Sequence, residues 1–123
     1  MKKSDIAYFR KEVKILKEKV KTPYPFSVRI MTIVDDQPRN GPLASETYGY
    51  CDYSSKKKKF NIGISKKLSL AQCLGILIHE LAHCISWQKE KAHHGKKWGI
   101  AYSKIYRICE KYVWGLDKED CSW

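Results

Sequence analysis

The sequence lacks any apolar run long enough to cross a bilayer. A membrane helix needs about 18 or more consecutive apolar residues, and each hydrophobic stretch here is interrupted by polar or charged side chains before that length. The N-terminus, Met1-Lys2-Lys3, is basic but leads into an amphipathic segment and has no secretory apolar core. These absences predict an intracellular protein, cytoplasmic or associated with the nucleoid, with no membrane partner.

The chain also lacks a Cys-x-x-Cys pair, although it has five cysteines. A cysteine zinc ribbon depends on such pairs, so the spacing argues against a zinc site built from cysteines. An odd number of unpaired cysteines in an intracellular protein is typical of buried free thiols. On a helix Cys84, directly after His83, would point away from a metal bound by that histidine.

Acidic residues are scarce: the chain has 13 Asp and Glu but 24 Lys and Arg, which gives a formal net charge of +11. Such an excess favours an anionic partner, and nucleic acid is the simplest one. The candidate contacts are three groups of lysines: Lys56, Lys57, Lys58 and Lys59; Lys66 and Lys67; Lys96 and Lys97. The alternative for the first group is a hairpin tip whose charges are solvated.

A chain of 123 residues is expected to form one domain, here residues 1–123. An amphipathic helix capped by Ser4 is predicted at residues 4–20. Its apolar stripe, at 3-4-3-4 spacing, is Ile6, Phe9, Val13, Leu16 and Val20. Strands are predicted at 26–34, 46–53 and 59–65, with a loop at 35–45 and a turn at 54–57.

A second helix is predicted at 70–85, because Ser69 and Gln72 have the spacing of a capping box. Nearly every non-histidine position in it is apolar, so apolar side chains lie on all sides, which predicts a buried helix. Gly75 within it suggests a close backbone approach. A last helix is predicted at 96–112, with Trp98, Tyr102, Ile105, Cys109 and Tyr112 on one stripe. The expected fold is α+β: an N-terminal helix, a three-stranded sheet, a buried helix and a C-terminal helix.

The buried helix contains His79-Glu80-Leu81-Ala82-His83. Two histidines at i and i+4 project from one helix face and can bind one Zn²⁺, while the glutamate beside the first can reach a metal-bound water. This is the arrangement of a zinc metallopeptidase, with Glu80 as general base and then acid. The alternatives are a structural metal site or a polar patch without a metal.

Catalytic zinc sites use three protein ligands and a water. The downstream candidates for the third ligand are His93, His94, Glu90 and Glu110. We favour His94, because the ten residues that separate it from His83 are enough for the chain to finish the helix and fold back, and Gly95 permits a sharp turn. Tyr102 is a candidate for stabilising the oxyanion, although nothing in the sequence establishes that role.

Between Gly49 and Trp98 the chain resembles the SprT-like metallopeptidases, the family that includes the Spartan protease. The matching segments are Gly49-Tyr50-Cys51, Phe60-Asn61-Ile62-Gly63-Ile64, residues 76–83 with the two histidines, and His94-Gly95-Lys96-Lys97-Trp98. A metzincin pattern does not fit, because position 89, where its third histidine would stand, is lysine.

The resemblance implies a zincin-like fold, zinc ligands His79, His83 and His94, and Glu80 as the catalytic base. It also implies that the strand at 60–65 borders the cleft and that a peptide substrate pairs along its edge. Eukaryotic relatives are proteases that act on proteins crosslinked to DNA, so the expected partners are a protein or peptide substrate and DNA, single- or double-stranded. Many relatives carry a C-terminal zinc ribbon, for which this chain has too few cysteines.

We therefore expect a monomeric zinc metallopeptidase that acts on protein associated with nucleic acid. The rival interpretation is a basic nucleic-acid-binding module with a structural or vestigial zinc site and no turnover. A third is a protein-interaction factor built on the same scaffold.

Overall fold

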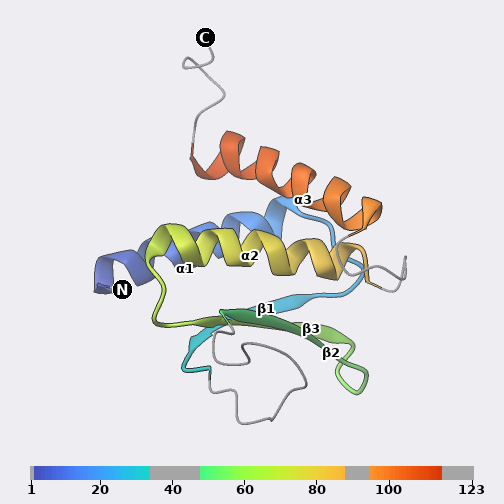
Figure 1. Cartoon of the computed structure of the whole chain (residues 1–123), viewed down its shortest axis with the longest axis horizontal. Helices are drawn as coiled ribbons and strands as arrows, with labels where there is room; N and C mark the ends of the chain where they lie inside the picture. The colour runs from blue at the N-terminus through green and yellow to red at the C-terminus, as the bar shows by residue number, and fades with distance from the viewer. Residues whose placement is uncertain (1, 34–47, 88–94, 115–123) are drawn as a thin grey trace, which may run out of the picture.

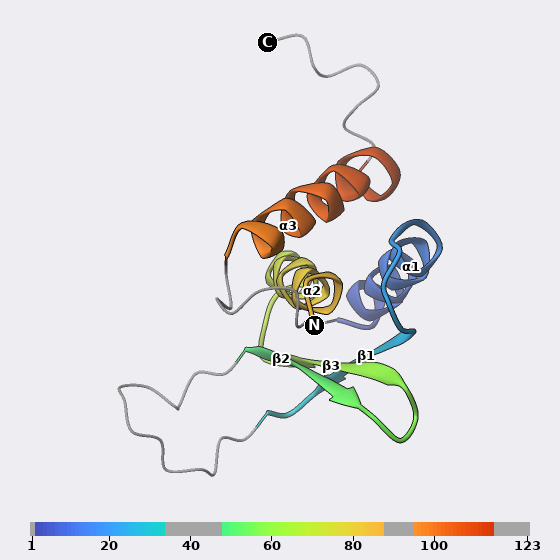
Figure 2. The ribbon, with the colours of Figure 1, turned by 90° about the vertical axis from the view of Figure 1, so that its right-hand side faces the viewer.

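The computed structural model describes residues 2–33, 48–87 and 95–114. In these ranges three helices and a three-stranded mixed sheet form an α+β fold, as predicted. Helices α1 (Lys3–Lys19) and α2 (Leu70–Ile85) lie side by side over one face of the sheet, and α3 (Lys96–Ile108) lies on their far side (Figures 1 and 2). None of the helices described is long and apolar enough to cross a membrane.

Helix α1 presents the predicted stripe to the interior, with Phe9, Leu16 and Val20 buried. Its start differs from the expectation, because Ser4 lies inside the first turn and does not cap it. Asp5 supplies the cap instead: its Oδ2 accepts a hydrogen bond of 3.2 Å from the backbone N–H of Lys2. A carboxylate in the first turn also interacts favourably with the helix dipole.

The sheet has the order β1-β3-β2, from β1 (Phe26–Met31), β2 (Gly49–Ser54) and β3 (Lys59–Ser65). Strand β3 matches its predicted bounds, β1 is shorter than predicted, and the loop expected at 35–45 lies outside the described residues. β3 pairs in parallel with β1 and antiparallel with β2. The expectation that substrate pairs along β3 is therefore wrong, because both hydrogen-bonding edges of this central strand are occupied.

Helix α2 begins as predicted, with Ser69 and Gln72 forming a capping box: Ser69 Oγ accepts from the Gln72 N–H at 3.3 Å, and Gln72 Oε1 accepts from the Ser69 N–H at 3.0 Å. The helix lies between the sheet and α3 (Figure 2), so its apolar side chains find buried surroundings on both sides. The interpretation of an apolar helix as a buried one is confirmed.

The C-terminal helix changes pitch near its end, where Cys109–Val113 form a π-helical turn. The backbone N–H of Trp114 donates to the Cys109 carbonyl at 2.7 Å, a bond that spans five residues. The extra residue rotates the following side chains about the axis. Tyr112, predicted on the buried stripe, is consequently 43% exposed, while Val113 and Trp114 pack against the core.

Glu12 of α1 is buried, although its position was not singled out by the sequence. Its side chain is 2% exposed, and neither carboxylate oxygen has a hydrogen-bond partner. Burial raises the pKa of Glu12 from 4.5 to about 7, because removing a carboxylate from water disfavours its charged form. The folded chain therefore holds this group in its neutral form up to near-neutral pH.

Glu12 should make the fold less stable as pH rises. The unfolded chain loses this proton near pH 4.5 and the folded chain near pH 7, so unfolding becomes easier across that interval and the loss levels off above it. From pH 5 to pH 8 the group's contribution falls by about 2 kcal/mol. Denaturant unfolding at both pH values should show that Glu12→Gln removes this loss.

The matched control is Glu18→Gln, an exposed glutamate on the same helix, which should leave the pH dependence as it is in the wild type. An unchanged pH dependence in Glu12→Gln would show that the buried carboxyl does not titrate as described.

Candidate metal centre

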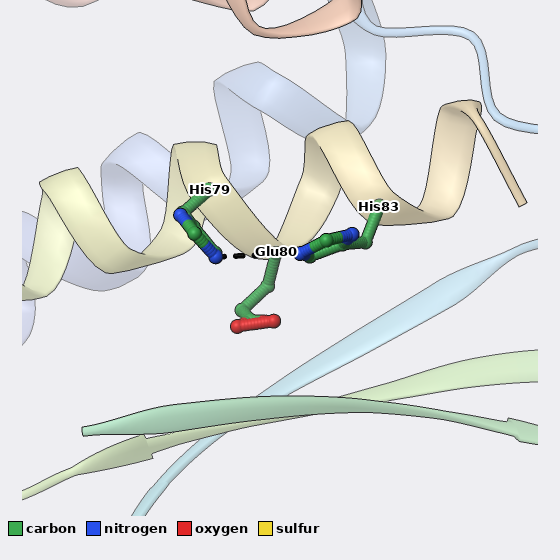
Figure 3. Close-up of side chains that lie close together, drawn as sticks. All are labelled: His79, Glu80 and His83. Carbon is green, nitrogen blue, oxygen red and sulfur yellow. Dashed lines mark hydrogen bonds between the residues drawn. The ribbon is translucent and has the colours of Figure 1, made fainter. Parts of the chain in front are cut away.

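The α-helical spacing of α2 brings two imidazoles together one turn apart. The Nε2 atoms of His79 and His83 are 3.3 Å from each other (Figure 3). Two nitrogens bound to one tetrahedral Zn²⁺ at 2.0–2.1 Å would be separated by about 3.3–3.4 Å. The two rings thus already have the separation that a shared metal ion requires.

Glu80 lies between the two histidines in sequence and extends toward the sheet (Figure 3). Its side chain is 6% exposed, and one ligand atom from each of the three residues lies within 4.8 Å of the other two. Burial raises the pKa of Glu80 from 4.5 to about 7, since desolvation disfavours the carboxylate. A carboxyl with a pKa near neutrality can both accept and return a proton.

Strand β2 runs beneath the face of α2 that carries Glu80. At Gly49 an added Cβ would lie 2.4 Å from Ile76 Cγ2, 3.2 Å from the Gly63 carbonyl oxygen and 3.7 Å from Glu80 Cγ. Two residues further on, Cys51 Sγ is 3.1 Å from Cys84 Sγ. The absence of a side chain at Gly49 therefore lets the strand approach the helix closely at the candidate base.

The opposite face of the sheet uses a second glycine. A Cβ on Gly63 would lie 2.1 Å from the ring of Tyr50, its neighbour across β2 and β3. The Tyr50 ring thus lies over Gly63 and extends to β1, where its hydroxyl is 3.3 Å from Met31 Sδ. Gly49, Tyr50 and Gly63 belong to the segments that carry the family resemblance. The packing of β2 against α2 and of the Tyr50 ring over β3 explains why these residue types occur there.

Helix α3 is joined to the two histidines through Trp98 in its first turn. The indole Nε1 donates to the backbone carbonyl of His79 at 3.3 Å, and the ring centroid is 5.2 Å from that of His79 and 5.7 Å from that of His83. The Tyr102 ring packs on Trp98 at 5.2 Å. Trp98, expected to be a core residue, also orients the imidazole-bearing turn.

Of the four candidates for the third ligand, the structure describes only Glu110. Glu110 is 12 positions after Trp98, about 18 Å along a helix, and it is absent from the His79, Glu80 and His83 cluster, the one group of possible ligands found among the described residues. Glu90, His93 and His94 lie outside the described residues. The described chain resumes at Gly95, three residues before Trp98.

The eight candidate lysines come from three separate segments of the described chain. Lys56, Lys57 and Lys58 are exposed in the turn between β2 and β3, where Lys58 adopts a positive φ of 51°. Lys66 and Lys67 follow the opposite end of β3, about 20 Å away for a seven-residue strand. Lys96 and Lys97 are exposed at the start of α3. A ligand touching the groups at both ends of β3 would have to extend over the length of that strand.

Comparison with known families matches residues 39–113 to the SprT-like family. The match covers more than half of the chain, which therefore belongs to the SprT-like family, as the sequence motifs indicated. Comparisons with curated proteins and with solved structures found no match. Membership suggests a domain related to metallopeptidases, and the His79, Glu80 and His83 cluster in the structure is able to hold a metal ion.

Gly49 and Gly75 provide a matched pair of substitutions. Gly49→Ala should destabilise the fold by about 1–3 kcal/mol, because the new methyl group meets Ile76 and neighbouring backbone. Around Gly75 no described atom lies within 4 Å of an added Cβ, so the close approach expected there is not found. Gly75→Ala should stabilise the fold by about 1 kcal/mol through helix propensity.

Both effects can be read from the free energy of unfolding in urea. Equal effects of the two substitutions would contradict the close contact between β2 and α2.

Proposed function

We propose that this chain is a zinc-dependent metallopeptidase with a zincin-like domain, in which His79, His83 and His94 bind Zn²⁺. The observation that carries the proposal is the 3.3 Å separation of the two Nε2 atoms beside the buried Glu80 carboxyl. Imidazole nitrogens are common zinc ligands, and both rings lie on the one helix that the sheet and α3 enclose.

His94 is proposed as the third ligand because of how the chain continues after it. Gly95 follows directly as the N-cap residue of α3, and Trp98 in the first turn of that helix contacts both imidazole rings. The fold thus returns the chain to the two histidines within four residues of position 94. Glu110, at the distant end of the helix, has no such connection.

Bound zinc would supply Lewis acidity, lowering the pKa of a coordinated water and polarising the substrate carbonyl. Glu80 would accept the proton from that water and deliver it to the leaving amine. The burial that raises its pKa suits a group that must hold the proton between these two steps. Trp98 would keep the His79 turn in place through its hydrogen bond to the backbone carbonyl.

The proposed substrate is a peptide segment of a protein associated with DNA. Since β3 is central, the edge available near Glu80 is that of β2, which in the described part of the chain pairs on one side only. An extended peptide added there would lie along the strand that runs beneath the candidate base. The exposed lysines and the net charge of +11 support a nucleic-acid partner close to the substrate.

Metal content tests the three-histidine site. Protein purified without added zinc should contain about one zinc per chain, because three imidazoles complete a catalytic set of protein ligands. Elemental analysis should show that His94→Ala loses most of this metal while the neighbouring His93→Ala retains it. Metal loss in His93→Ala alone would assign the third ligand to His93, and a zinc-free wild type after zinc is supplied would overturn the site.

Hydrolysis tests the role of Glu80. Glu80→Gln keeps the shape of the side chain but removes its ability to take a proton, so cleavage of a fluorescently labelled basic protein should fall by at least 100-fold, the order of general-base contributions. Zinc content should stay at the wild-type level. The assay is run with and without single- and double-stranded DNA to detect activation.

The rival function, nucleic-acid binding without turnover, makes a different forecast for the same variant. In that case wild type and Glu80→Gln would bind DNA equally and neither would cleave protein, whatever the metal content. Cleavage that persists in Glu80→Gln would remove Glu80 from the mechanism.

A further inference from the structure

Two cysteines distant in sequence meet beneath α2. Cys51 of β2 and Cys84 of α2 are 33 positions apart, yet their Sγ atoms are 3.1 Å from each other. All four described cysteines are free thiols. Cys73 Sγ is directed at the carbonyls of Ser65 and Leu68 at 4.0 Å. Among the described cysteines, one pair thus has its sulfurs in contact.

The pair continues the line of contacts between β2 and α2. Alternate residues of a strand point to the same face, and along β2 these are Gly49 under Glu80, Cys51 against Cys84, and Tyr53, whose ring centroid is 6.1 Å from that of Trp87. Cys84 follows Glu80 by one helical turn and lies on the same side of α2. A covalent bond there would join strand and helix next to the Glu80 carboxyl.

We propose that Cys51 and Cys84 form a reversible redox site that peroxide oxidises to a disulfide. Cys51 is partly exposed whereas Cys84 is fully buried, so the Cys51 sulfur meets the oxidant first. It attacks one peroxide oxygen, the O–O bond breaks, and Cys51 sulfenic acid and one water form. The Cys84 sulfur then attacks Cys51 Sγ, the S–O bond breaks, and a second water leaves with the Cys84 proton.

The sulfurs need to move only a short distance for this reaction. A disulfide has an S–S length of about 2.05 Å, so they must approach by about 1 Å from their 3.1 Å contact. In a reducing compartment such a bond is transient and is opened again by cellular thiols. The cross-link closes a loop that includes all of β3, and loop closure of this kind restricts the unfolded chain.

The test treats the full-length protein with hydrogen peroxide and measures intact mass under non-reducing conditions. We expect a loss of about 2 Da, which corresponds to two hydrogens, and a peptide map with Cys51 joined to Cys84. The temperature of unfolding should rise by several degrees and return to its starting value after dithiothreitol. None of these readouts depends on metal or hydrolysis, so they remain valid if the proposed protease activity is not found.

Substitutions assign the reaction to this pair. Cys51→Ser, at a partly exposed position that should tolerate the hydroxyl, is expected to abolish the 2 Da loss and the thermal shift. Cys121→Ser, outside the described residues, should react as the wild type does. A peptide map that joins Cys51 to any other cysteine, or a Cys51 oxidised to sulfinic acid while Cys84 stays a free thiol, would overturn the proposal, as would no change of mass.

Discussion

The close contact between β2 and α2 is the constraint on which the rest of the arrangement depends. Because Gly49 has no side chain, the strand approaches Ile76 and the Cγ atom of Glu80 closely. The Glu80 side chain is consequently almost fully shielded from water. Burial in turn raises the pKa of Glu80 toward neutrality. The same approach brings Cys51 to Cys84 and Tyr53 to Trp87, so the buried Glu80 carboxyl and the pair of cysteines depend on one packing feature.

On its other side α2 is held by α3, and Trp98 is the residue that transmits this contact to the histidines. Its indole bonds to the His79 backbone and lies against both imidazoles. Within the described residues, the two histidines that could hold a metal ion therefore lie on a helix that packs against the sheet on one side and α3 on the other. Such contacts matter because a metal site whose ligands are not held in position by neighbouring residues loses affinity for the metal.

Among the residues that the structure describes, two glutamates, Glu12 and Glu80, are buried, and burial raises the pKa of both. Their settings differ. A Glu80 carboxylate oxygen lies within 4.8 Å of two imidazole nitrogens, which are potential proton acceptors. The oxygens of Glu12, in contrast, have no hydrogen-bond partner. A carboxyl with a shifted pKa therefore indicates a functional site only when the groups around it are considered as well.

Local patterns in the sequence determined the elements: the 3.6-residue periodicity marks α1 and α3, alternation marks the strands, and Ser69 with Gln72 marks the start of α2. The i and i+4 spacing of His79 and His83 determined their common face, since a helix has one geometry. Tertiary packing decided what depends on residues distant in sequence. It made β3 the central strand, buried Glu12, placed Cys51 on Cys84, left open space at Gly75, and turned Tyr112 outward through a π-helical turn. No local pattern carries that information, because each outcome is set by which surfaces meet after the chain has folded.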